Sequence, residues 1–174
     1  TYIVDCQSLA IVAGYGMSEI LFEGCSFYTY HYQSYAFYMV QNSGGVFDGI
    51  VFRNNTFYVK GYLMWTGGAT GSSSNLTTVG YRKNFEFTGN KVYFDKSQFP
   101  ASAADYYMIV VNHWDRVVIS NNVIQDTSDF PVGYVSNNYY IIRTGQCHSV
   151  ICRNNEIKWS YNVPAYGNKY GIAV

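Results

Sequence analysis

The chain has 174 residues, of which 11 are basic and 11 acidic, so its formal net charge at neutral pH is zero. This balance excludes a nucleic-acid-binding protein that depends on surplus positive charge, and 48% hydrophobic residues exclude a disordered acidic tail. No apolar run approaches the roughly 18 residues that a membrane-spanning helix needs. Aromatic residues make up 19% of the chain, 19 of them tyrosines, and such enrichment favours β-strands.

Five segments of eight residues share one pattern, and they follow one another at separations of 30 to 35 residues. The segments are residues 20–27, 50–57, 85–92, 117–124 and 150–157. In every copy positions one, three and eight are apolar, and position five is Gly or Asn. Apolar residues two apart predict a strand with one face inward. Gly or Asn at a fixed place predicts a tight bend with positive φ, after which position eight begins a new strand.

A further strand is predicted before each segment. These strands are centred on residues 9–11, 37–39, 62–64, 106–108 and 139–141, and residues 170–172 open a sixth copy. Three strands per repeat with no helical periodicity predict a parallel β-helix. We expect an all-β solenoid of about five coils of 30 to 35 residues. With coils spaced by about 4.8 Å, the stack would be about 24 Å long.

Position six of the repeat predicts a ladder of side-chain amides. It holds Asn55, Asn90, Asn122 and Asn155, with Cys25 in the first copy. Amides stacked in register can hydrogen-bond to the coils above and below, and such ladders reinforce stacked strands.

The Val-x-Ile-x-Asn-Asn-x-Ile pattern of residues 117–124, together with the Asn ladder, resembles the right-handed parallel β-helix of the pectin-lyase-like superfamily. Within that superfamily it resembles the β-helix segments of phage tailspikes and polysaccharide depolymerases. We expect a single β-helix domain over residues 1–174 and, because the repeat starts and ends mid-coil, an excerpt of a longer chain. The resemblance implies recognition of a polysaccharide or cell-surface glycan, possible depolymerisation of that polymer, and a location outside the cell or on a virion.

The same superfamily leaves other activities open, because it includes polysaccharide lyases, glycoside hydrolases and non-enzymatic adhesins. The paired-Asp and Gly-His-Gly signatures of polygalacturonases are absent from the sequence, as is the Arg-x-Pro-x-x-Arg element of pectate lyases. A bacterial lyase or hydrolase and a structural β-helix therefore stand as alternatives, and whether the chain is an enzyme stays open.

The connections that leave position eight are long and rich in aromatic residues. Because they leave the stack on one side, we expect them to form a continuous rim that binds sugar rings through flat aromatic faces. The predicted substrate-binding residues are Tyr28, Tyr30, Tyr32, Tyr35, Phe130, Tyr134, Trp159, Tyr161 and Tyr166. The same connections hold Tyr93 and Asp95. The alternative is that these aromatic residues only pack the connections onto the coils.

Position two should face solvent, yet it is apolar in four of five copies. It reads Leu21, Val51, Glu86, Val118 and Ile151. An exposed apolar stripe of this kind is covered by a loop or a flanking domain, or forms a subunit interface. The resemblance to tailspikes implies the second alternative, a homotrimer.

Ionisable residues gather two places before position one. This column reads Ser18, Asp48, Lys83, Asp115 and His148. Asp48 and Asp115 lie two coils apart, about 9.6 Å, which is near the carboxyl separation of about 6.5 to 9.5 Å in inverting glycosidases. Lys83 lies between them and would hold both ionised. The candidate catalytic residues are Asp48 and Asp115 with the flanking His113 and Arg116. The cluster around Asp115 could also serve a lyase. The alternative to a catalytic role is that the column is a solvated row of ion pairs.

The positions of the four cysteines in the repeat predict that they are free thiols. Cys25 and Cys152 are four coils apart, about 19 Å, which is beyond disulfide reach. The Cys and His residues lack the spacing of zinc ligands, so we expect no metal and no cofactor.

Overall fold

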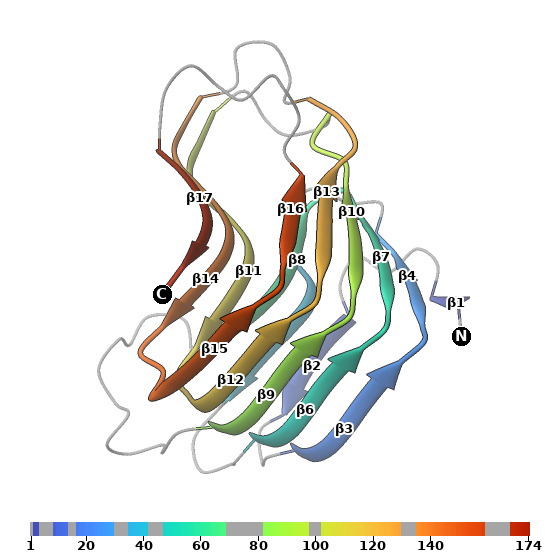
Figure 1. Cartoon of the computed structure of the whole chain (residues 1–174), viewed down its shortest axis with the longest axis vertical. Coiled ribbons are helices and arrows are strands. Elements are labelled where there is room, and N and C mark those ends of the chain that lie inside the picture. The colour runs from blue at the N-terminus through green and yellow to red at the C-terminus, as the bar shows by residue number, and fades with distance from the viewer. Residues whose placement is uncertain are drawn as a thin grey trace.

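The chain forms an all-β parallel solenoid of three sheets in the computed structural model, which describes residues 2–3, 9–13, 17–29, 35–41, 47–68, 82–97, 102–129, 135–158 and 168–174. The coils stack across the view of Figure 1, with the N-terminus on the right and the C-terminus on the left. Every strand pairing is parallel. Within the described residues no helix is long and apolar enough to cross a membrane.

Each repeat supplies one strand to each sheet, in the order B, C, A. Sheet B contains β2 (Leu9–Ala13), β5 (Tyr35–Gln41), β8 (Tyr62–Gly68), β11 (Ser102–Asn112), β14 (Val135–Gly145) and β17 (Asn168–Ala173). Sheet C contains β3 (Met17–Glu23), β6 (Phe47–Arg53), β9 (Arg82–Thr88), β12 (Trp114–Ser120) and β15 (Ser149–Arg153). Sheet A contains β1 (Tyr2–Ile3), β4 (Ser26–Tyr28), β7 (Thr56–Val59), β10 (Lys91–Phe94), β13 (Val123–Asp126) and β16 (Glu156–Lys158).

The bend between sheets C and A is made by position five of the repeat, as predicted. Gly24, Asn54, Gly89, Asn121 and Asn154 all have positive φ, between 54° and 65°. Gly and Asn tolerate this left-handed conformation best, because other side chains clash with the backbone there. At Gly89 a Cβ atom would also collide with the Asn54 side chain of the preceding coil. The repeat therefore turns the chain at the same residue in every copy.

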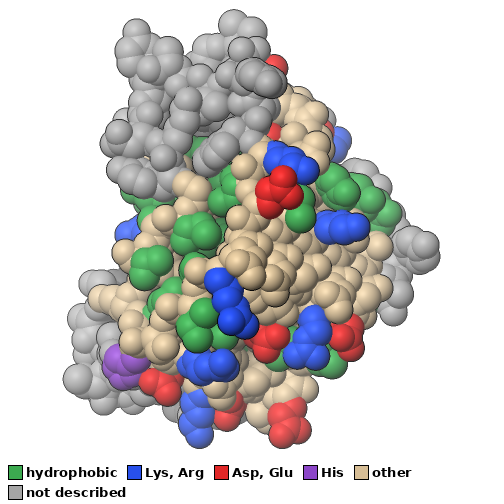
Figure 2. Space-filling model, viewed as in Figure 1, with side chains coloured by type: hydrophobic (Ala, Val, Ile, Leu, Met, Phe, Trp, Pro, Cys, Tyr) green, Lys and Arg blue, Asp and Glu red, His purple; other side chains and the backbone are tan. Residues whose placement is uncertain are grey.

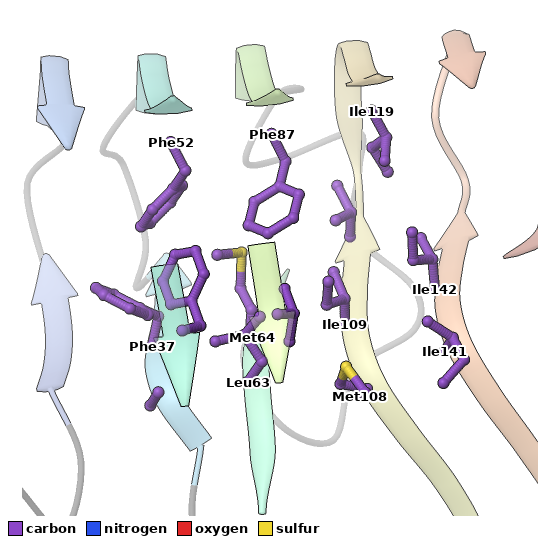
Figure 3. Packing of buried hydrophobic residues seen from close by; sticks show 14 of the residues in the cluster. Phe37, Phe52, Leu63, Met64, Phe87, Met108, Ile109, Ile119, Ile141 and Ile142 are labelled. Atoms are coloured by element: carbon purple, nitrogen blue, oxygen red, sulfur yellow. The ribbon is translucent and has the colours of Figure 1, made fainter. Parts of the chain in front are cut away.

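The core lies between the three sheets and is filled by the inward positions of the repeat. Figure 3 shows Phe52, Phe87 and Ile119 of sheet C facing Phe37 and Met64 of sheet B. The ring of Phe52 stacks on Phe22, with centroids 4.8 Å apart, and meets Phe37 edge-on at 4.9 Å. Period-two burial thus brings residues far apart in sequence into one continuous hydrophobic core.

The Asn ladder is present and runs through the bend. The Nδ2 group of Asn55 donates to Oδ1 of Asn90 at 3.1 Å, Asn90 donates to Asn122 at 3.1 Å, and Asn122 donates to Asn155 at 2.8 Å. Each Oδ1 also accepts the backbone N–H of the preceding coil, beginning with Cys25 N–H to Asn55 at 2.9 Å. Every Nδ2 group further donates to the backbone carbonyl of an inward residue in sheet C. The ladder therefore satisfies buried amides and main chain together.

Candidate functional site

Three tyrosines form a row on the outward face of sheet A. They follow the inward residues at position eight, so alternation along each strand turns them outward. The register pairs Tyr28 with Tyr58 and Tyr58 with Tyr93. Their rings stack with centroids 4.7 Å apart between Tyr28 and Tyr58, and 5.2 Å apart between Tyr58 and Tyr93. Tyr58, in the middle of the row, is 40% exposed. Aromatic surface is thus presented to solvent across three coils.

A polar row lies beside the tyrosine row, two residues further along each strand. It contains Lys60, Asp95 and Thr127. The backbone N–H of Asp95 donates to Val59 O at 2.8 Å, and that of Thr127 donates to Phe94 O at 2.8 Å. The strand register of sheet A is thus extended past the strand ends, and the polar row lies next to the tyrosine row on successive coils.

The two rows line a pocket of about 280 Å³ on the outside of sheet A. Its lining residues are Tyr28, Thr29, Tyr58, Val59, Lys60, Tyr93, Asp95 and Thr127. In Figure 2 one of several groups of hydrophobic side chains, a class that includes tyrosine, lies toward the upper right. The lining is largely apolar, with an aromatic floor made by the tyrosines, and the residues of the polar row lie along one side of it.

The carboxylate of Asp95 is held in one orientation. Its Oδ1 atom accepts hydrogen bonds from Ser128 Oγ–H at 2.7 Å and from the backbone N–H of Ser97 at 3.0 Å. Burial acts to raise the pKa of Asp95, but the hydrogen bonds from Ser128 and Ser97 and the nearby Lys60 ammonium outweigh it, so the pKa falls below its ordinary value. Asp95 therefore presents an ionised acceptor to the pocket at neutral pH.

A buried ion pair supports this side of the pocket. Lys96 Nζ lies 2.6 Å from Asp126 Oδ2, and the two side chains are 0% and 2% exposed. The backbone N–H of Lys96 donates to Ser128 Oγ at 2.6 Å. Ser128 thus links the pair to Asp95. Because a buried charge without its partner is costly, the pair ties the residue after Asp95 to the neighbouring coil.

Two of the nine predicted substrate-binding residues lie in the described part of the chain. Tyr28 lines the pocket. Tyr35 lies on sheet B instead, where its ring is 4.7 Å from that of Tyr62 and 5.6 Å from that of Trp65. Tyr30, Tyr32, Phe130, Tyr134, Trp159, Tyr161 and Tyr166 fall outside the described residues. The structure therefore brings only Tyr28 of this set to the pocket.

Five of the eight pocket residues were not singled out from the sequence: Thr29, Tyr58, Val59, Lys60 and Thr127. Tyr58 follows Phe57 just as Tyr28 follows Phe27, so extending the repeat alignment to position nine would have found the row. Lys60, Asp95 and Thr127 all stand at position eleven of the repeat, so extending the alignment further would also have found the polar row.

The predicted catalytic residues lie in register at the start of the sheet C strands, close to the corner with sheet B. Lys83 Nζ is 3.9 Å from Asp48 Oδ2, and Asn84 Nδ2 donates to Asp48 Oδ1 at 2.8 Å. His148 Nδ1 is 2.8 Å from Asp115 Oδ1. His113 Nε2 contacts Gln146 Oε1, and the Arg116 side chain is exposed.

These contacts are those of an exposed row of paired charges. The Asp115 and His148 side chains are 58% and 55% exposed. Figure 2 shows acidic and basic side chains interspersed along the lower edge, where the strands of sheet C lie. The row is on a different sheet from the tyrosine pocket and contributes no residue to its lining. A catalytic role for Asp48, Asp115, His113 and Arg116 remains a prediction.

The apolar stripe on sheet C is aligned as predicted but unevenly exposed. The register pairs Leu21 with Val51, Val51 with Glu86, and Val118 with both Glu86 and Ile151. Leu21 is 53% and Ile151 39% exposed, whereas Val118 is only 8% exposed. A side chain that points outward is not exposed for that reason alone, since the neighbouring coils cover part of a side chain in the middle of the row. The trimer predicted through Leu21, Val51, Val118 and Ile151 stays a prediction.

Cys25, Cys147 and Cys152 are free thiols, while Cys6 lies outside the described residues. Burial raises the pKa of Cys147; backbone hydrogen bonds and the Arg82 guanidinium oppose this less strongly. Burial also raises the pKa of Cys152. Among the described residues no cluster of three His, Cys, Asp or Glu side chains could hold a metal ion.

These raised pKa values predict slow alkylation of the folded protein. Because the thiolate is the nucleophile, a higher pKa lowers the reactive fraction at every pH below it. At about pH 8 we expect iodoacetamide to label Cys147 and Cys152 more slowly in the native protein than in urea, with a rate that rises towards higher pH. Peptide mass spectrometry after timed quenching measures this. Equal rates in the folded and unfolded protein would contradict the assignment.

No family model matches the chain, and no significant match to a curated protein or to a solved structure was found. The candidate site therefore rests on the chemistry of its residues.

Proposed function

We propose that this protein recognises a polysaccharide, and that the tyrosine pocket of sheet A is where the polymer binds. The observation that carries the proposal is the pairing of an aromatic floor, made by Tyr28, Tyr58 and Tyr93, with the polar row of Lys60, Asp95 and Thr127. Such a role matches that of a tailspike-like β-helix in the pectin-lyase-like superfamily. The glycan would then be on a cell surface, and the protein would act outside the cell or on a virion.

Sugar rings suit this pocket because they are amphipathic. Their C–H groups pack on aromatic surface, and their hydroxyl groups need both donors and acceptors. The tyrosine rings partly cover one another, so a sugar ring would meet their edges and the offset parts of their faces. The volume of about 280 Å³ is near the lower end of the range for ligand pockets, about 300 to 1,000 Å³. It therefore suits one or two sugar units of a longer chain.

The direction of the rows favours a polymer over a free sugar. The tyrosine row runs along the solenoid axis and continues past Tyr93 with Gln125 and Lys158 in the same register. The outer face of sheet A therefore offers polar groups beyond the pocket, where further units of an extended chain could lie.

Replacing Tyr58 with alanine is expected to weaken glycan binding about tenfold or more, because it removes the central ring of the floor. The probes are bacterial surface, plant and algal polysaccharides on an array, followed by calorimetry with the glycan retained best. Tyr140→Ala is the matched control: Tyr140 also stacks on a tyrosine, Tyr107, at 4.9 Å, but on sheet B. Circular dichroism of both variants checks the fold.

Three outcomes are distinguished. Loss of binding in the Tyr58 variant with wild-type binding in the Tyr140 variant would support the pocket. Wild-type affinity in the Tyr58 variant would remove the pocket as the binding site, and no glycan retained by the wild-type protein would overturn the function.

A further inference from the structure

The pocket of sheet A offers one fixed charge and one charge on a long side chain. Asp95 is anchored through Oδ1, which accepts from Ser128 Oγ–H and from the Ser97 backbone N–H at 2.7 and 3.0 Å. Ser128 is in turn hydrogen-bonded to the Lys96 backbone at 2.6 Å. Lys60 carries its charge at the end of four methylene groups, which adapt to what is bound. The position of the Asp95 carboxylate is therefore fixed, and a ligand has to place its own groups to suit it.

The two charges make different demands on a sugar. A hydroxyl group can donate to the Asp95 carboxylate and can also accept from the Lys60 ammonium. A sugar carboxylate can only accept, so it satisfies Lys60 but cannot donate to Asp95. It would also lie near an ionised group of the same sign in a partly desolvated pocket, where like charges repel more strongly than in water.

We propose that Asp95 makes this pocket selective for a neutral, hydroxyl-bearing sugar unit and against a unit that carries a carboxylate. The inference rests on the proposed function and names the chemical class of sugar that the same site takes. Asp95 is then a specificity-determining residue, and Ser97 and Ser128 position its carboxylate.

The test compares a uronic acid oligosaccharide with its carboxyl-reduced form, in which each carboxylate has become a neutral hydroxymethyl group. The probes are an oligogalacturonate of about six units and its carboxyl-reduced counterpart. An oligosaccharide of this length would lie along a short stretch of one sheet face. The wild-type protein should bind the neutral member about tenfold more tightly or better, because a lost charge-assisted hydrogen bond is worth at least that factor. Binding of the carboxylated member as tightly as the neutral one would overturn the inference.

Asp95→Asn assigns the effect to this residue. Asparagine keeps an oxygen for Ser128 and Ser97 to donate to, but it removes the charge. The variant should bind the two probes with affinities within about threefold of each other, since the amide group neither repels a sugar carboxylate nor lacks a hydrogen to donate to it. Glu156→Gln is the matched control, since it removes one negative charge from the same face; Glu156 is 58% exposed, next to Lys158, and does not line the pocket. An unchanged preference in Asp95→Asn, or an equal loss of preference in Glu156→Gln, would contradict the inference.

Failure of this inference can be told apart from failure of the proposed function. If the carboxylated probe binds well and Tyr58→Ala abolishes that binding, the pocket still binds glycan but Asp95 does not select against charge. If neither probe binds and the array also retains no glycan, the proposed function fails and this inference fails with it.

Discussion

Replacing Phe52 with alanine is expected to lower the free energy of unfolding by about 3–5 kcal/mol, the range for removing a buried phenylalanine ring. Phe52 is 0% exposed and lies in the centre of the core. Its ring contacts the rings of Phe22, Phe37, Phe57, Phe85 and Phe87, at centroid distances between 4.8 and 6.3 Å. The variant would lose these contacts and leave a cavity, because strands fixed on three sheets cannot close around it.

Urea denaturation followed by circular dichroism measures this loss. Phe52→Leu is the matched variant, since it keeps most of the volume and should cost less than about 1.5 kcal/mol. A change in the alanine variant below about 1 kcal/mol would mean that Phe52 is not in a close-packed core.

Asn122→Ala is expected to lower the free energy of unfolding by about 2–4 kcal/mol, although asparagine is smaller than phenylalanine and polar. Asn122 is 0% exposed, and its side chain takes part in four hydrogen bonds. Alanine would leave the backbone N–H of Asn90 and the carbonyl of Phe87 without their partners in a buried setting. The loss of stability comes mainly from these two unsatisfied backbone groups, because water cannot reach them.

Asn155→Ala provides the comparison within the ladder. Asn155 is only half-buried and lies in the last of the five copies, so water can replace part of what its side chain supplies. We expect the loss for Asn155→Ala to be about half of that for Asn122→Ala. Equal and negligible effects for both variants in the same urea titration would show that the ladder does not stabilise the solenoid.

The repeat made the coil predictable from sequence because each of its positions has a separate physical cause. Apolar residues at positions one and three predicted the strands of sheet C. Gly or Asn at position five predicted the bend, and Asn at position six predicted the ladder. The structure has the bend at Asn121 and the ladder at Asn122. The ionisable column was also predicted in register, and in it Asp48 pairs with Lys83 and Asp115 contacts His148.

The candidate site could be predicted only in part, because it depends on contacts between coils beyond the repeat. Tyr28 was identified from its connection, but the pocket exists only because Tyr58 and Tyr93 stack beside it. The anchoring of Asp95 by Ser128 joins residues 33 apart on neighbouring coils, and no local pattern marks it. Val118 shows the same limit, since the alignment gives the direction of a side chain but not how far adjacent coils cover it.

The most direct test of polysaccharide recognition by sheet A is amide NMR of the full 19.8 kDa chain, titrated with an oligosaccharide from the glycan that the array retains. We expect the largest chemical-shift changes at Tyr58, Lys60, Tyr93 and Asp95, with little change along sheet C. Changes concentrated around Asp48 and Asp115 instead would place glycan binding on the row of paired charges, and would contradict the assignment of the site to the tyrosine pocket.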